Sequence, residues 1–170
     1  MIIWFSGLSG SGKSTLGREI VKRLWNGYLI DGDELRVGLC KDLGYSEGDR
    51  RENMRRACEL GKIIEKLGYI VVVALISPIE LDREMIREMV GDRLVEIYLS
   101  TSLGICEGRD VKGLYKKVRN GEIRDFTGID SRYEIPKKSD LVLDTGIVGI
   151  EECISRIYEI YQNKSKKGDK

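Results

Sequence analysis

Short apolar runs recur along the chain, and segments with regularly spaced polar positions separate them. The longest run, residues 70–76, is apolar at every position and rich in Val and Ile, which is typical of a strand buried on both faces. Runs of this kind predict β-strands at residues 2–5, 28–30, 70–76, 94–99 and 141–143.

Helical periodicity marks the segments between these runs. Leu16, Ile20 and Leu24 are spaced four residues apart, so they share one face of a helix. The clearest amphipathic pattern spans residues 50–67, and Gly68 follows as a typical helix stop. Further helices are predicted at residues 81–90, 102–109 and 150–161, and residues 34–49 are predicted to be a loop that holds one helical turn.

The alternation of strands with helices predicts one α/β domain with a mainly parallel sheet over residues 1–162. Ligands of such sheets bind at the carboxyl ends of the strands. Residues 110–136 have weak periodicity, many charges and three glycines, a pattern that predicts a mobile lid. Residues 163–170 are polar and are predicted to form a disordered tail.

The charge balance narrows the range of partners. Lys and Arg number 29 and Asp and Glu number 28, which gives a net charge of +1. This balance argues against binding to nucleic acid or to a membrane surface. No apolar run approaches the length of about 18 residues that a membrane span needs.

The inventory of reactive side chains excludes several chemistries. The chain has no histidine, which removes histidine metal sites and Ser-His-Asp hydrolysis. The four cysteines are far apart and form no CxxC, so we expect small buried thiols in a reducing compartment: Cys40, Cys58, Cys106 and Cys153. The first predicted strand begins at residue 2, which leaves no room for a signal peptide, and we therefore expect a cytoplasmic protein.

A glycine-rich turn between the first strand and the first helix carries the strongest motif. Residues 7–14, GLSGSGKS, fit G-x-x-x-x-G-K-[ST], the phosphate-binding loop of P-loop NTPases. In such a loop Lys13 bridges the β- and γ-phosphates of ATP and Ser14 holds Mg²⁺. The motif and its context predict a three-layer α/β/α fold of the P-loop NTPase type; the alternative is a glycine-rich turn that binds nothing.

Two carboxylates follow the second predicted strand. Asp31 and Asp33 flank a glycine and point to the same side of an extended segment. One could hold Mg²⁺ and the other could accept a proton from an attacking hydroxyl. The alternative is a turn in which both aspartates accept hydrogen bonds from backbone N–H groups. The phosphate loop ahead of them favours the functional interpretation.

Further segments make the chain resemble the adenylylsulfate kinase family over residues 2 to about 160. The resemblance rests on the phosphate loop extended to Thr15, on Asp31-Gly32-Asp33, and on a lid block that is more distinctive than either. The lid block consists of RDVKGLYKK at 109–117, GEI at 121–123 and FTGID at 126–130. The resemblance also includes KDLGY at 41–45, DRRENMRR at 49–56 and ISP at 76–78.

The resemblance implies a kinase that uses ATP and Mg²⁺ to phosphorylate the ribose 3′-hydroxyl of adenosine 5′-phosphosulfate (APS). The implied products are ADP and 3′-phosphoadenosine 5′-phosphosulfate. Asp33 is then the expected general base and Asp31 the carboxylate on the Mg²⁺ side, although these two roles could be exchanged. The family is commonly dimeric, so the resemblance also implies a homodimer.

The resemblance also assigns binding residues. The expected ATP site comprises Gly7, Leu8, Ser9, Gly10, Ser11, Gly12, Lys13, Ser14, Thr15 and the lid residue Arg109. The expected APS site comprises Asp33, Arg36, Tyr45, Arg50, Asn53, Ile76, Ser77, Lys112 and Phe126, with Tyr45 and Phe126 on the two sides of the adenine. Ser77 is a phosphorylated intermediate in one description of the family, but direct in-line transfer needs no such relay. A plain capping role is its alternative.

Three positions depart from the family pattern. Glu34 stands where Asn is usual, and Val37 and Cys40 replace residues that are commonly His and Asn. These departures leave open a related kinase for another nucleotide, such as a cytidine diphosphoramidate, or for another small hydroxyl compound of the gluconate or shikimate type.

Other classes of P-loop protein fit the sequence less well. A GTP-dependent switch would carry N/T-K-x-D after a strand, and the sequence has no such segment. A degenerate binding module without activity would be expected to lack Lys13 or the aspartates, and all three residues are present.

Overall fold

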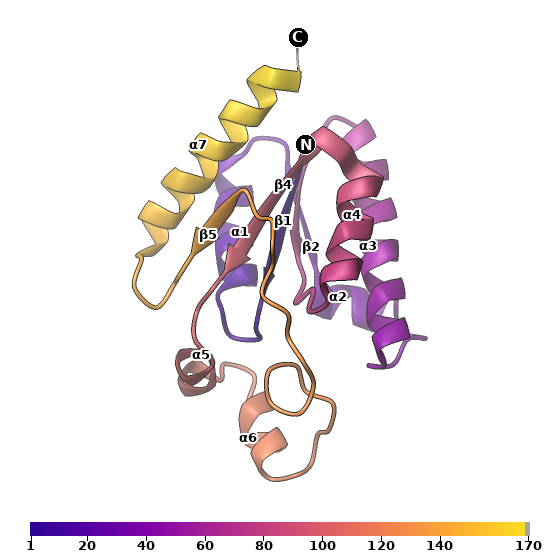
Figure 1. Cartoon of the computed structure of the whole chain (residues 1–170). Helices are drawn as coiled ribbons and strands as arrows, with labels where there is room; N and C mark the ends of the chain where they lie inside the picture. Colours follow the sequence, from indigo (N-terminus) through magenta and orange to yellow (C-terminus); the bar gives the residue numbers. More distant parts are fainter. Residues whose placement is uncertain (169–170) are drawn as a thin grey trace.

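The computed structural model describes residues 1–168, and a parallel five-stranded sheet forms its centre (Figure 1). The spatial order of the strands is β2-β3-β1-β4-β5. All pairs are parallel, so the carboxyl ends of the strands meet along one edge of the sheet. The strands are β1 (Ile2–Gly7), β2 (Gly27–Asp31), β3 (Ile70–Ala74), β4 (Leu94–Leu99) and β5 (Leu141–Leu143).

Helices cover both faces of this sheet, which gives the predicted three-layer α/β/α arrangement. In Figure 1, α1 and α7 lie on one face, and α3 and α4 lie on the other. The helices are α1 (Lys13–Arg23), α2 (Gly32–Val37), α3 (Glu47–Lys66), α4 (Glu80–Val90), α5 (Leu103–Arg109), α6 (Leu114–Arg119) and α7 (Ile150–Gly168), with a 3₁₀ turn η1 (Gly91–Arg93) after α4.

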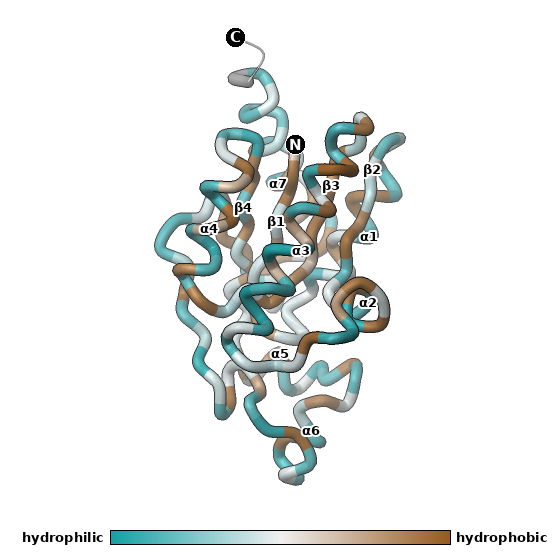
Figure 2. The backbone as a smooth tube through the Cα atoms, turned by 90° about the vertical axis from the view of Figure 1, so that its right-hand side faces the viewer, coloured by the Kyte–Doolittle hydropathy of each residue, from teal (hydrophilic) through white to brown (hydrophobic). Residues whose placement is uncertain are grey.

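The core has two halves, one on each side of the sheet. Alternation along β1 divides its side chains between them, because successive residues of a strand point to opposite faces. Ile2 and Trp4 pack with the buried faces of α3 and α4. Ile3 and Phe5 pack with α1 and α7. Figure 2 shows the resulting concentration of hydrophobic residues on the strands, whereas the segment around α6 is mostly hydrophilic.

The predicted strands are all present, and the helices differ from prediction mainly at their ends. Helix α3 begins at Glu47, three residues before the predicted start, because the hydroxyl of Ser46 caps it by accepting a 3.1 Å hydrogen bond from the N–H of Asp49. Helix α2 lies in the segment predicted to hold one turn. Strand β3 ends at Ala74, two residues before the end of its apolar run.

The C-terminal segment corrects one prediction. Helix α7 continues to Gly168, so residues 163–168 are helical rather than disordered. The ammonium group of Lys164 anchors this part of the helix: it donates to the carbonyl oxygen of Leu94 at 2.6 Å and to the carboxylate of Asp140 at 2.7 Å. The prediction for residues 169–170 lies outside the described residues.

The predicted lid, residues 110–136, lies beyond the carboxyl ends of the strands and contains α6 (Figure 1). The four cysteines are free and buried, as predicted. Within residues 1–168, no helix combines the length and the apolar character that a membrane crossing requires.

Candidate active site

A cavity of about 1060 Å³ opens at the carboxyl ends of the strands. It brings together residues from the phosphate loop, the end of β2, α2, α3, the end of β3 and the lid. The expected site residues that line it are Ser9, Gly10, Gly12, Lys13, Ser14, Thr15, Asp31, Asp33, Arg36, Tyr45, Arg50, Asn53, Ile76, Ser77, Arg109, Lys112 and Phe126. Three members of the phosphate loop, Gly7, Leu8 and Ser11, are not part of this lining.

The phosphate loop has the backbone shape that its glycines predict. Gly10 has φ 79°, in the left-handed region that favours glycine. A Cβ atom at Gly10 would lie 2.8 Å from the carbonyl oxygen of Cys106, so a side chain there would collide with α5. Helix α1 begins directly after the loop at Lys13, so its positive dipole end faces the cavity.

The ammonium group of Lys13 lies inside the loop. It donates to the carbonyl oxygens of Gly7 at 2.8 Å and of Leu8 at 2.7 Å, and to the hydroxyl of Ser11 at 3.3 Å. Burial lowers the pKa of Lys13 to about 8. The negative charge of a bound phosphate would stabilise the charged form of Lys13 and so raise its pKa again.

Asp31 combines the two roles that the sequence left open. Its Oδ1 caps α2 by accepting from the N–H of Asp33 at 3.0 Å, which is the turn interpretation. Its Oδ2 is buried and has no hydrogen-bond donor among the described residues. The nearest cation, Arg18, lies 3.7 Å away. An unpaired carboxylate oxygen beside a phosphate loop suits a metal-bound water or a metal ion.

Asp33 is more open than Asp31, with 65% of its side chain exposed. It forms an ion pair with Lys112 of the lid. Lys112, a cation of the lid, therefore contacts the carboxylate of Asp33, the residue expected to act as the general base. Lys112 contacts only Oδ2 of Asp33, so the other carboxylate oxygen has no cation bound to it among the described residues.

Two arginines surround Tyr45 at the mouth of the cavity. The guanidinium carbon of Arg36 lies 4.4 Å from the centre of the Tyr45 ring, and that of Arg50 lies 5.6 Å from it. Arg50 also donates to the carbonyl oxygens of Tyr45 at 2.8 Å and of Asp125 at 2.7 Å. Burial and the nearby charge of Arg36 lower the pKa of Arg50. Two cations so close together form a site for an anion.

The floor of the cavity contains buried polar side chains. Asn53 is 5% exposed, and its Oδ1 has no donor among the described residues. Ser77, beside Ile76, is 2% exposed with φ 50°, and its hydroxyl accepts a 2.9 Å hydrogen bond from Trp4 Nε1. The N-cap position of α4 is Ile79 and not Ser77, and no side chain of that position caps the helix, so the capping alternative for Ser77 is wrong.

Arg109 depends on a residue that the sequence analysis did not identify, Thr145. Arg109 donates to the hydroxyl of Thr145 at 2.8 Å, to its carbonyl oxygen at 2.7 Å and to the carbonyl oxygen of Gly10 at 3.1 Å. The Thr145 hydroxyl in turn donates to the carbonyl oxygen of Ser11 at 2.9 Å. Its position just after β5, at the carboxyl edge of the sheet, is the only sequence signal that could have found it.

The three departures from the family pattern lie in different surroundings. Val37 lines the cavity and is 83% exposed. Cys40 is fully buried in the core beside α3. Glu34 is exposed on α2 and is absent from the lining of the cavity, so its negative charge does not enter the site. Of the three, only Val37 can contact a ligand in this cavity.

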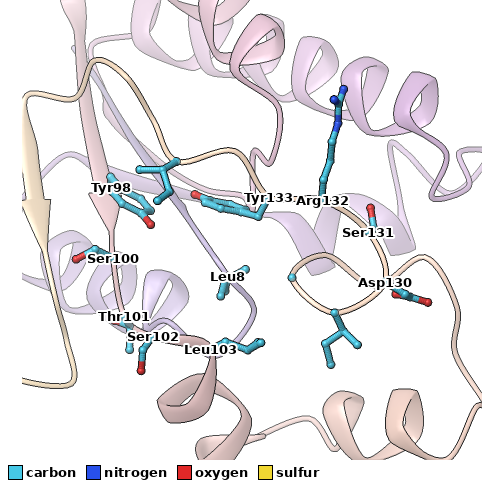
Figure 3. Close-up of a pocket in the computed structure, with 13 residues that line it drawn as sticks. Leu8, Tyr98, Ser100, Thr101, Ser102, Leu103, Asp130, Ser131, Arg132 and Tyr133 are labelled. Carbon is cyan, nitrogen blue, oxygen red and sulfur yellow. The ribbon is translucent and has the colours of Figure 1, made fainter.

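A second cavity, of about 520 Å³, lies on the other side of the phosphate loop (Figure 3). Leu8 and Leu103 line it together with the end of the lid, residues 128–133. The rings of Tyr98 and Tyr133 stack beside it, with their centres 6.1 Å apart. Leu8 is the only expected site residue in its lining, so this cavity is a packing gap between the loop and the lid rather than part of the predicted site.

The arrangement in the large cavity suits phosphoryl transfer between two bound anions. Lys13 and the N-terminus of α1 provide a phosphate site at one end, and Arg36 and Arg50 provide an anion site at the other. Asp33 lines the same cavity, and a carboxylate is chemically suited to accept a proton.

Comparison with known proteins supports this interpretation. The family model described as adenylylsulphate kinase matches residues 1–144. An adenylyl-sulfate kinase of Bacillus velezensis is 51% identical over 167 residues, which cover 95% of this chain and 85% of that protein. One from Clostridium kluyveri is 45% identical over 168 residues, covering 96% and 84%. A solved APS kinase of Mycobacterium tuberculosis, in complex with AMPPNP and APS, has a TM-score of 0.91 and 40% identity, covering 95% of this chain and 96% of that one.

Proposed function

Because the chain belongs to the adenylylsulphate kinase family, we propose that it transfers the γ-phosphoryl group of ATP to the ribose 3′-hydroxyl of APS. The products are ADP and 3′-phosphoadenosine 5′-phosphosulfate, the activated form of sulfate used in sulfate assimilation. The observation that carries the proposal is the single cavity that is lined by the phosphate loop, the aspartate pair, both arginines and the lid.

ATP binds with its phosphates in the loop that precedes α1. Lys13 turns from the carbonyl oxygens of Gly7 and Leu8 to bridge the β- and γ-phosphates. Arg109, held by Thr145, extends from α5 toward the same nucleotide.

Ser14 and Asp31 are the residues that would hold Mg²⁺, since both line the cavity and Asp31 Oδ2 is buried without a donor. Among residues 1–168, no cluster of three or more His, Cys, Asp or Glu could hold a metal ion on its own. This suits Mg²⁺, which binds through few protein ligands and the substrate phosphates. When bound, Mg²⁺ neutralises charge on the transferring phosphoryl group.

APS binds at the opposite end of the cavity. Arg36 and Arg50 hold its phosphosulfate oxygens, and Tyr45 and Phe126 enclose the adenine. Asn53, with its unpaired oxygen, and the Ile76–Ser77 segment complete the floor.

Transfer is direct and in line. The 3′-hydroxyl displaces Lys112 from Asp33, and Asp33 accepts the hydroxyl proton while the oxygen attacks the γ-phosphorus. Lys112 is then free to contact the second nucleotide. Ser77 supports the floor through the hydrogen bond that its hydroxyl accepts from Trp4, and direct in-line transfer requires no phosphate on this residue.

The kinase reaction is tested by ADP release with Mg-ATP and APS. Rapid release is expected with APS, and only slow release without a second substrate, because the closed site excludes water. Cytidine and uridine nucleotides, gluconate and shikimate form the comparison panel. Turnover of one of these and none of APS would contradict the proposed substrate and would point to Val37, the one departure that lines the cavity.

Nucleotide binding is expected to take up protons at alkaline pH. Lys13 has a pKa of about 8 in the free protein, so at pH 8.5 most of it is neutral, and bound phosphate restores its charge. ATP affinity should therefore fall as the pH rises through 8. Calorimetry of a non-hydrolysable ATP analogue in two buffers with different ionisation enthalpies measures the uptake. Lys13→Arg is the control, because arginine stays charged and should take up none. Equal heats in both buffers for the wild type would contradict the shifted pKa.

Two further properties complete the proposal. The family resemblance suggests a homodimer, which analytical ultracentrifugation would distinguish from a monomer. The four free, buried cysteines suit the reducing environment of the cytoplasm, where ATP is available.

A further inference from the structure

Tyr115, on the first turn of α6 in the lid, has surroundings that the proposed reaction does not explain. It is 1% exposed and among the largest fully buried side chains, although the segment around it is mostly hydrophilic (Figure 2). Its backbone is fixed by Asp110, whose carboxylate accepts from the N–H groups of Tyr115 and Lys116, both at 3.0 Å. The lid therefore holds this one aromatic ring in a defined place.

The hydroxyl of Tyr115 contacts the phosphate loop. It donates a 2.9 Å hydrogen bond to the carbonyl oxygen of Ser9, and burial raises the pKa of Tyr115, which keeps the hydroxyl protonated as a donor. A trans peptide holds its C=O and N–H on opposite sides, so this bond turns the N–H of Gly10 away from Tyr115. Arg109 holds the next carbonyl oxygen, that of Gly10, at 3.1 Å. Tyr115 and Arg109 thus fix the orientation of two consecutive peptide groups of the phosphate loop, those that follow Ser9 and Gly10.

The ring of Tyr115 contacts the other site. It meets the ring of Phe126 edge to face, with the ring centres 5.0 Å apart. Phe126 is one of the two aromatic residues proposed to enclose the adenine of APS. A nucleotide that stacks on Phe126 therefore also affects the Tyr115 ring, which contacts Phe126 and whose hydroxyl is hydrogen-bonded to the phosphate loop.

We infer that Tyr115 is a positioning residue that couples the two nucleotide sites, so that occupation of either one strengthens binding at the other. The inference rests on the proposed function, because it needs APS at Phe126 and ATP at the loop. In the free protein, Tyr115 is the one aromatic residue paired with Phe126 within residues 1–168, and their rings meet edge to face. Bound APS fixes Phe126, then Tyr115, and then the Ser9–Gly10 peptide in the orientation that ATP needs. By linkage, ATP raises the affinity for APS by the same factor.

A second contact between lid and loop provides a contrast. Gly128 packs against Leu8, where an added Cβ would lie 2.8 Å from the Leu8 side chain. This contact is apolar and fixes no peptide group. The hydroxyl of Tyr133, another lid residue (Figure 3), is also buried, and it lies near the hydroxyl of Ser6 on β1. Tyr133→Phe therefore removes a buried hydroxyl from the lid without removing a hydrogen bond to the phosphate loop, and it is the matched control for Tyr115→Phe.

The test is a binding cycle with a non-hydrolysable ATP analogue and APS. The affinity for each ligand is measured with and without the other, and the ratio gives the coupling factor. Tyr115→Phe keeps the ring and removes the bond to Ser9, so it should reduce the coupling factor by about 2- to 10-fold, the worth of one hydrogen bond. The affinity for APS alone should change little. Tyr133→Phe should leave the coupling factor unchanged.

A coupling factor in Tyr115→Phe equal to that of the wild type would overturn the inference, and so would an equal loss in Tyr133→Phe. Amide hydrogen exchange of the unmutated protein provides a test that needs no variant. APS alone should slow exchange at residues 8–12, and unchanged exchange there would also overturn the inference. Failure of the wild type to bind APS would count against the proposed function instead, and the cycle would then be run with the substrate that the panel identifies.

Discussion

Replacing Asp33 by Asn is expected to lower kcat by about 10²- to 10⁴-fold, the usual contribution of a general base. Asn has the same shape as Asp but cannot accept the proton of the ribose hydroxyl. The exposed ion pair with Lys112 is lost, yet such pairs contribute little to stability. The variant should therefore fold normally and bind both nucleotides, with a change in KM much smaller than the change in kcat.

Steady-state kinetics with ATP and APS, together with a thermal unfolding curve, would measure these effects. Glu34→Gln is the matched control, since Glu34 is the next residue, carries the same charge, is exposed and does not line the cavity. It should retain full kcat. A kcat for Asp33→Asn within a few-fold of the wild type would exclude Asp33 as the base. Asp31→Asn would then test the alternative in which Asp31 is the general base and Asp33 lies on the Mg²⁺ side.

Much of the fold was predictable because buried parallel strands consist of nearly continuous apolar residues. The five strands were found in this way, and their parallel pairing followed from the alternation with helices. The ends of elements were less predictable, since they depend on single contacts. Ser46 extends α3 by one cap, and Lys164 anchors the end of α7 to Leu94 and Asp140. The lysine lies far from both partners in sequence, so no local pattern could indicate the contact.

The site was predictable to the extent that motifs determine it. The phosphate loop and the aspartate pair each follow a strand, and the register of a parallel sheet brings such ends together. Phe5 of β1 and Asp31 of β2 both pair with Ala74 of β3, which lies between these two strands. The lid residues came from the family resemblance alone. Thr145 and Tyr115 were missed because they act through hydrogen bonds to backbone carbonyl oxygens, and any part of the chain can present such an oxygen.

Helix α4 is the element whose packing contradicts its pattern most clearly. Leu81 is 65% exposed, whereas Arg83 is 1% exposed. The guanidinium of Arg83 donates to Glu80 at 2.6 Å and to the carbonyl oxygens of Ser77 at 2.5 Å and of Glu134 at 2.7 Å. It therefore joins the floor of the active site to the end of the lid. A buried charge with this many partners is costly to disrupt.

Replacing Arg83 by Met is expected to lower the free energy of unfolding by about 3–5 kcal/mol, the largest stability change proposed for this chain. Methionine fills much of the same volume but leaves the Glu80 carboxylate with Arg87 as its remaining cation. Because Ser77 and the lid then lose a shared anchor, KM for APS should also rise. Urea denaturation at pH 7, followed by circular dichroism, measures the free energy difference.

The pH dependence of the difference in unfolding free energy between wild type and Arg83→Met distinguishes two contributions of Arg83: its ion pair with Glu80 and its packing in the core. Burial would raise the pKa of Glu80, but hydrogen bonds from Arg83 and Arg87 hold it below the ordinary value of 4.5. A carboxyl group with a depressed pKa stabilises the fold above its unfolded pKa, and this contribution is lost as the pH falls. The difference in unfolding free energy between wild type and Arg83→Met should therefore stay constant from pH 7 to about pH 5 and narrow as the pH is lowered further, through the unfolded and then the folded pKa of Glu80. Arg55→Met removes an exposed ion pair with Glu52 and should cost less than about 1 kcal/mol at pH 7, so the change of this cost with pH should be correspondingly small. A difference for Arg83→Met that stays constant below about pH 5 as well would mean that Arg83 stabilises the fold through packing alone.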